Sequence, residues 1–129
     1  MKFHLRARLT AEFVDSTFLV AAVIGSGIMG ERLAGGNVAL ALLANTIATG
    51  AALVARIAAF VDVSGAHFNP VVTLADAIEG HFSWLEATAY VVIQVVGGIV
   101  GAVMAHAMFG LPAISLSARP RHGSTLVFS

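Results

Sequence analysis

The chain has 129 residues, of which 58% are hydrophobic and 11% are charged, with seven basic residues, seven acidic residues and no cysteine. Soluble domains usually carry about 25% charged residues, so this composition excludes a typical water-facing surface and indicates a membrane protein. A chain without cysteine forms no disulfides or thiolate zinc sites, and the balanced charge removes the basic surface on which nucleic-acid binding depends.

Three apolar segments are long enough to cross the ~30 Å hydrocarbon core of a bilayer, which takes roughly 20 helical residues. A cleaved signal peptide is the competing interpretation of the first segment, but Glu12 and Asp15 interrupt the region where a signal peptide has its apolar core. We therefore expect one membrane domain over residues 1–111, followed by a polar tail over residues 112–129. The three spans are expected at about residues 9–29, 38–60 and 84–111.

Residues 62–79 lie between the second and third spans, and their apolar part is too short to cross. Asn69 and Pro70 form a helix start, because asparagine caps free backbone N–H groups and proline is tolerated in the first turn. Irregular backbone before this start must be buried in protein or line a water-filled cavity if it lies at membrane depth. The segment is therefore either a re-entrant loop with a half-helix or a surface loop with a short interfacial helix.

Three motifs resemble the major intrinsic protein family of aquaporins and glycerol facilitators, in the same order and spacing. SGAHFNPVVT at residues 64–73 looks like the first signature of that family, AEF at 11–13 resembles its opening helix, and AYVVIQVVGG at 89–98 resembles its third helix. The agreement extends from about residue 8 to 111. The resemblance implies an all-α membrane protein in which three transmembrane helices and one re-entrant half-helix form a single aquaporin-like repeat.

The resemblance also implies roles for individual residues, because in this family two inverted repeats meet at paired Asn-Pro-Ala motifs in the middle of the membrane. The side-chain amide of Asn69 would donate a hydrogen bond to passing water or solute, and the carbonyl groups of residues 65–67 would form half of the solute ladder. Thr49 would contribute to the outer selectivity constriction. Glu12 and Gln94 would be buried supports of the re-entrant loop. The expected pore-lining residues are Thr49, Gly65, Ala66, His67, Asn69, Pro70 and Val71.

Two features depart from the family pattern. Val71 replaces the usual alanine of the motif, and the sequence holds no second Asn-Pro motif. Because a single repeat cannot enclose the pore, we expect a passive channel for water or small neutral solutes that requires a second half repeat. Similarity of residues 25–50 to a bacterial subgroup associated with arsenic resistance makes glycerol-like or metalloid species candidate solutes. The alternative is a truncated, non-conducting fragment, or a helical interaction partner of a full-length channel.

The remaining expectations concern chemistry, partners and location. The sequence has no Ser-His-Asp, GxSxG, HExxH or glycine-rich phosphate-loop motif, so no enzyme activity, metal or cofactor is expected. The expected partners are the lipid bilayer, water or a small neutral solute, and either further copies of the chain, as a homo-oligomer, or another half repeat. The expected location is the cell inner (plasma) membrane, crossed several times, with only a weak bias of basic residues between its two sides.

Two charged residues stand inside the expected spans. If the first span runs outward and the second returns, Asp15 and Arg56 lie within one or two turns of the same membrane face, which predicts an ion pair. The alternative is that Arg56 extends to the lipid headgroups. Arg56 also shares a helical stripe with Asn45, Thr49 and Ala52, which either lines a pore or forms a helix-packing seam. A stripe on the third span, with an expected packing role, consists of Tyr90, Gln94, Gly97 and Gly101.

Overall fold

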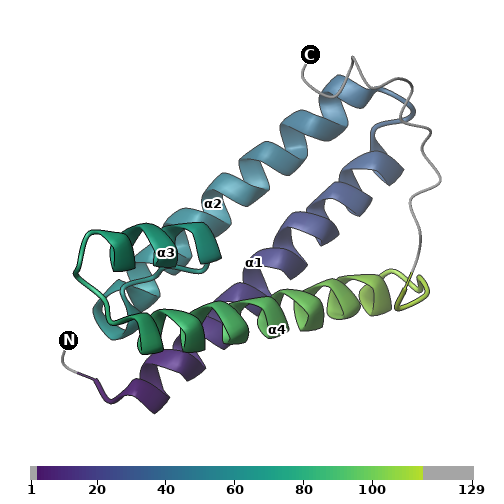
Figure 1. Ribbon diagram of the computed structural model, residues 1–129. Helices are drawn as coiled ribbons and strands as arrows, with labels where there is room; N and C mark the ends of the chain where they lie inside the picture. The colour runs from purple at the N-terminus through teal and green to yellow at the C-terminus, as the bar shows by residue number, and fades with distance from the viewer. Residues whose placement is uncertain (1–2, 115–129) are drawn as a thin grey trace, which may run out of the picture.

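The computed structural model describes residues 3–114 and is entirely helical (Figure 1). Three of its helices are long and apolar enough to cross a membrane, and the fourth is short. This confirms the expected fold class. Part of the expected polar tail, residues 115–129, lies outside the described residues. The helices are α1 (Leu5–Leu33), α2 (Val38–Ser64), α3 (Pro70–Ile78) and α4 (Trp84–Met108).

Helices α2 and α3 begin where the local sequence supplies a side-chain cap. The side chain of Asn37 accepts a hydrogen bond from the Leu40 N–H at 3.1 Å at the start of α2. Asn69 accepts one from the Val71 N–H at 2.9 Å, with Pro70 as the first residue of α3. Each cap satisfies a backbone donor that has no partner within the helix. The helix start expected at Asn69 and Pro70 is therefore confirmed.

The helices are not coextensive with the expected spans. Helix α1 is longer than residues 9–29 at both ends, and α2 continues four residues past residue 60, to Ser64. Helix α4 ends at Met108 instead of continuing to residue 111, because Gly110 adopts a φ of 66°, which lies outside the helical region. The depth at which a bilayer would cut each helix stays a prediction.

Helix α1 packs against both α2 and α4, and the short α3 packs against the first half of α4 (Figure 1). Gly97 and Gly101 of α4 face the backbone of α1 near Phe13 and Thr17, so the two helices approach closely at small residues. The expected packing role of this stripe is confirmed. At the same end of the molecule as α3, Ala77, Phe82, Ala87 and Tyr90 form a small buried apolar cluster.

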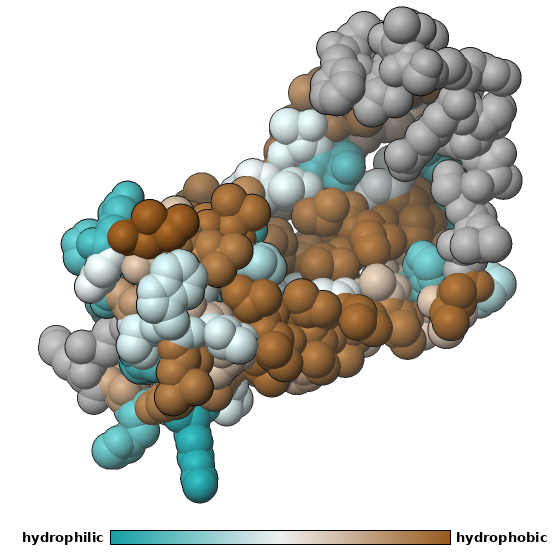
Figure 2. Space-filling model, in the orientation of Figure 1, coloured by the Kyte–Doolittle hydropathy of each residue, from teal (hydrophilic) through white to brown (hydrophobic). Residues whose placement is uncertain are grey.

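Apolar side chains cover much of the face shown in Figure 2, and large apolar side chains are exposed on all three long helices. Helix α2 is the most exposed of the three, because the rest of the chain buries almost none of its most apolar stretch. A water-soluble protein rarely exposes so large a continuous apolar area. In a bilayer these side chains face lipid or other helices, as in a multi-pass membrane protein. The large exposed apolar side chains of α2 include Leu40, Leu42, Leu43, Ile47, Val54, Ile57 and Val61.

Candidate functional site

The segment between α2 and α3, residues 65–69, has irregular backbone. Gly65 ends α2 in the left-handed conformation, with a φ of 88°, and Ala66 and Phe68 follow with φ values of 54° and 39°. The left-handed region costs a residue with a side chain about 1–2 kcal/mol. Such a conformation persists only where the surrounding structure holds it in place.

The carboxylate of Glu12 holds this segment. It is completely buried on α1 and accepts backbone N–H groups from His67 at 3.0 Å and from Phe68 at 2.8 Å. It also accepts the Ser64 hydroxyl at 2.7 Å and the Gln94 amide at 2.8 Å. One carboxylate thus joins α1, the end of α2, the irregular segment and α4. Glu12 and Gln94 thus make the contacts that their expected role, support of the irregular segment, would need.

The imidazole of His67 is turned into the protein. Its Nδ1 lies 3.1 Å from the Thr73 hydroxyl, and its ring packs against Phe82 and Tyr90, with centroid distances of 5.2 and 5.5 Å. Its Nε2 lies 3.5 Å from a carboxylate oxygen of Asp76 on α3. The side chain of His67 therefore anchors the segment to α3 and α4, and its backbone carbonyl is the group left for a pore.

Several backbone carbonyls of the segment have no protein partner. Within residues 3–114, the carbonyl oxygens of Gly65, Ala66 and His67 accept no hydrogen bond. At membrane depth such acceptors must meet water or a polar solute, because hydrocarbon offers them nothing. Phe68 separates them from Asn69, which is exposed.

Asn69 presents a donor next to these acceptors. Its Oδ1 accepts the Val71 N–H at 2.9 Å, which leaves the amide Nδ2 free to donate. Asn69 is also the N-cap of α3, where the helix dipole places partial positive charge. Successive carbonyl acceptors, followed along the chain by an amide donor, suit a small neutral molecule that can both donate and accept hydrogen bonds. Pro70 begins α3 behind Asn69, and Val71 beside it is 71% exposed.

Thr49 lies on α2, away from this segment along the helix. Its hydroxyl is 3.4 Å from Asn45 Oδ1, which also accepts the Ser26 hydroxyl of α1 at 2.7 Å. Asn45 and, further along, Arg56 therefore contact α1, so this part of the polar stripe is a packing seam. The role of Thr49 in a selectivity constriction stays a prediction.

The expected ion pair between Asp15 and Arg56 is confirmed. Arg56 Nε donates to Asp15 Oδ1, and both side chains are buried between α1 and α2. The alternative in which Arg56 extends to the headgroups is wrong, because its guanidinium turns inward and lies 5.0 Å from the centroid of the Phe68 ring.

A second charged contact was missed from the sequence. Arg8 Nε donates to the Tyr90 hydroxyl and its Nη1 to Glu86, both at 2.8 Å, and Tyr90 in turn donates to the Ser64 carbonyl at 3.1 Å. The available signal was spacing, since Arg8 stands one helical turn before Glu12 on the same face of α1. This chain of hydrogen bonds fastens the end of α2 to α1 and α4.

Replacing Tyr90 by phenylalanine tests this connection. The ring and its packing remain, but the Arg8 Nε and the Ser64 carbonyl lose their shared partner in a buried site. We expect the free energy of unfolding to fall by about 1–3 kcal/mol, measured by unfolding in mixed detergent micelles. Phe82→Leu is not a suitable control because it changes the core, whereas Ser83→Ala alters an exposed cap and should cost about 1 kcal/mol or less. A Tyr90→Phe variant as stable as the parent would contradict this contribution.

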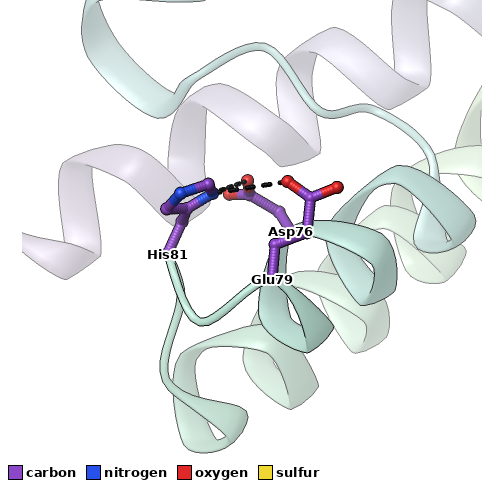
Figure 3. Close-up of side chains that lie close together, drawn as sticks. All are labelled: Asp76, Glu79 and His81. Carbon is purple, nitrogen blue, oxygen red and sulfur yellow. Dashed lines mark hydrogen bonds and ion pairs between the residues drawn. The ribbon is translucent and has the colours of Figure 1, made fainter.

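Three ionisable side chains gather at the end of α3 (Figure 3). The imidazole of His81 points toward the carboxylates of Asp76 and Glu79, at 3.3 and 3.6 Å. His81 and Glu79 are exposed. Their proximity is that of ordinary surface pairs, which contribute little to the free energy of unfolding. The sequence did not single out these three as metal ligands, and their contacts assign them no metal.

The model of the major intrinsic protein family matches residues 1–125, which include the irregular segment, its Glu12 support and all four helices. The chain belongs to the major intrinsic protein family. The expectation of a multi-pass membrane protein is confirmed, and the family to which the chain belongs is one of membrane channels and not of enzymes.

Members of the family from bacteria and plants are similar to this chain. Aquaglyceroporin AqpS of Rhizobium meliloti (strain 1021) is 48% identical over 122 residues, which cover 95% of this chain and 52% of that protein. Aquaporin NIP1-4 of Oryza sativa subsp. japonica is 36% identical over 110 residues, or 85% of this chain and 39% of that protein. Aquaporin TIP1-2 of Zea mays is 34% identical over 113 residues, or 84% and 44%. The chain thus spans about half the length of the curated relatives it matches.

Proposed function

We propose that this chain forms one half of a passive channel for water or small neutral solutes in the plasma membrane. The observation that carries the proposal is the file of unpartnered carbonyls at residues 65–67 leading to the free amide of Asn69. A water molecule stripped of its neighbours can donate to the first groups and accept from the last, so that its dehydration is compensated. A cation would find no compensating acceptor at the amide and the positive end of α3.

The solute class follows from the same groups. A molecule with several hydroxyl groups, such as glycerol or an un-ionised metalloid hydroxide, can use acceptors and a donor together, as water does. The name aquaglyceroporin belongs to the Rhizobium relative, and its 48% identity supports including such solutes here. We therefore propose water and small neutral polyhydroxyl species as the substrates of the completed channel.

The channel requires a second half repeat opposite this one. Helix α3 presents an exposed apolar face of Val71, Val72 and Ile78, and the unpartnered carbonyls line one side of a passage only. Another copy of the chain in the opposite orientation, or a half repeat supplied by another polypeptide segment, would cover this face. The basic residues do not favour one orientation strongly, since an inward N-terminus places Lys2, Arg6, Arg8 and Arg56 on one side and Arg32, Arg119 and Arg121 on the other.

Osmotic swelling of vesicles that contain the purified chain tests the proposal. We expect a water permeability above that of protein-free lipid, and Asn69→Asp should return it to the lipid level. Aspartate keeps the oxygen that caps α3 but replaces the amide donor with a second acceptor. Asn37→Asp is the matched control, because it makes the same change at the cap of α2, remote from the segment.

The outcomes separate the two functions considered. A conducting parent with an unchanged Asn69→Asp variant would remove Asn69 from the path. A parent no more permeable than lipid would instead support the alternative of a non-conducting fragment or an interaction partner of a larger channel. A reporter of membrane orientation fused after Ser129 tests which polypeptide supplies the second half repeat. A single fixed orientation would eliminate pairing between two oppositely oriented copies. Another polypeptide segment would then have to supply the second half repeat.

A further inference from the structure

Arg56 joins the buried ion pair to the irregular segment. Its Nε donates to Asp15 of α1, and its guanidinium carbon lies 5.0 Å from the centroid of the Phe68 ring. Phe68 is the residue immediately before Asn69. The side chain of Arg56 thus lies between a completely buried carboxylate and the aromatic ring of the segment that carries the candidate site.

The ion pair between Asp15 and Arg56 is not well arranged to stabilise the folded chain. Within the described residues, Asp15 Oδ2 and both terminal nitrogens of Arg56 are buried without a hydrogen-bond partner. Buried ion pairs whose remaining donors and acceptors are unmet are often no more stable than apolar residues of similar volume. A buried polar group left unpartnered in this way calls for an explanation other than stability.

Phe68 needs to be held on two sides. Its φ of 39° is unfavourable for an aromatic residue, and Glu12 fixes its N–H at 2.8 Å. That bond restrains the peptide but leaves the ring free to turn about its own side-chain bonds. The guanidinium of Arg56 lies over the ring and contacts it through a cation–π interaction.

We propose that Arg56, oriented by Asp15, is a positioning residue that fixes the Phe68 ring and thereby the direction of the Asn69 amide and the preceding carbonyls. The consequence for transport rests on the proposed function, whereas the effect on the segment does not. Lysine should fill this role less well than Arg56, because its ammonium keeps the charge opposite Asp15 but lacks the planar guanidinium that stacks on aromatic rings.

Hydrogen–deuterium exchange of the full chain in detergent measures the effect directly. In Arg56→Lys we expect the amides of His67 and Phe68, both bound to Glu12, to exchange about tenfold faster than in the parent. Peptides from the middle of α4 should exchange unchanged. Arg32→Lys is the matched control, because Arg32 lies 5.1 Å from the Phe109 ring at the other end of the molecule.

A second variant separates positioning from simple ion pairing. The double change Asp15→Ala with Arg56→Leu removes both charges and should restore the folded yield that either single change lowers. Exchange at His67 and Phe68 should nevertheless stay fast, because the cation–π contact with the Phe68 ring is then lost. In vesicles, the ratio of water to glycerol permeability should fall several-fold in the same variant.

Two results would overturn the proposal. One is parental exchange at His67 and Phe68 in Arg56→Lys, with the chain folded. The other is full recovery of slow exchange in the apolar double variant, which would make the pair an ordinary contact between α1 and α2. Exchange is measured on protein that need not conduct, so a failure of the proposed channel function would be seen separately, in the vesicle assay.

Discussion

Replacing Glu12 by alanine should destabilise the chain more than any other single substitution considered for it. Four donors would lose their common acceptor at a completely buried position: the His67 and Phe68 N–H groups, the Ser64 hydroxyl and the Gln94 amide. Each buried donor left without a partner costs about 1–3 kcal/mol. We expect a loss of about 4 kcal/mol or more, seen as a collapse of folded yield and of the unfolding midpoint in mixed detergent micelles.

A conservative variant and a surface control make the Glu12 result specific. Glu12→Gln keeps the volume and one acceptor oxygen but turns the other into a donor that faces N–H groups, so it should also be destabilised, though less than alanine. Glu79→Ala removes a carboxylate from the exposed end of α3 and should change the free energy of unfolding by less than about 1 kcal/mol. A Glu12→Ala variant with the stability of Glu79→Ala would show that the carboxylate does not hold the segment.

Adding a methyl group at Gly97 or Gly101 should force α1 and α4 apart. A Cβ at Gly97 would lie 2.7 Å from the Phe13 carbonyl oxygen, and one at Gly101 would overlap the carbonyl of Thr17. Neither obstacle is a flexible side chain, so the helices themselves must move. Overpacking of this kind costs about 1–3 kcal/mol, occasionally more, and we expect at least the upper part of that range for Gly101→Ala.

Gly98 provides the control within the same turn. A Cβ there would meet Val20 at 3.6 Å, an ordinary contact, so Gly98→Ala should leave the unfolding midpoint nearly unchanged. Because Gln94 stands one turn before Gly97 on α4, the displaced helix should also weaken the Gln94 bond to Glu12. Equal stability of the Gly97, Gly98 and Gly101 alanine variants would contradict the close approach of α1 and α4.

Features that depend on neighbouring residues could be predicted from the sequence. The Asn69-Pro70 pair predicts the start of α3, because a capping side chain bonds to backbone groups only two or three residues away. The same local capping occurs at Asn37, where α2 begins. Apolar length located the three long helices. The Asp15 and Arg56 pair followed from counting turns along two antiparallel helices, a geometry that charges inside a membrane restrict strongly.

Features that depend on several distant residues at once could not be derived locally. The four partners of Glu12 lie on three other parts of the chain. The residues alone did not decide whether residues 62–79 form a re-entrant segment or a surface segment. The expected role of Glu12 came from the family resemblance. The bond between Arg8 and Tyr90 joins residues 82 positions apart, which no periodicity reveals. The end of α4 before residue 111 depends on the backbone conformation of Gly110. The apolar sequence continues to residue 111 and therefore does not indicate this end.

The central claim is that the passage exists only when two half repeats meet. Water permeability of vesicles prepared over a range of densities of the parent chain tests this most directly, with Asn69→Asp at each density as the blank. If a second copy supplies the other half, permeability above the blank should rise faster than in proportion to the amount of protein, as expected for association of two chains. A permeability equal to that of bare lipid at every density would contradict conduction by this chain, and conduction at densities so low that most protein-bearing vesicles hold a single copy would contradict the need for a second copy.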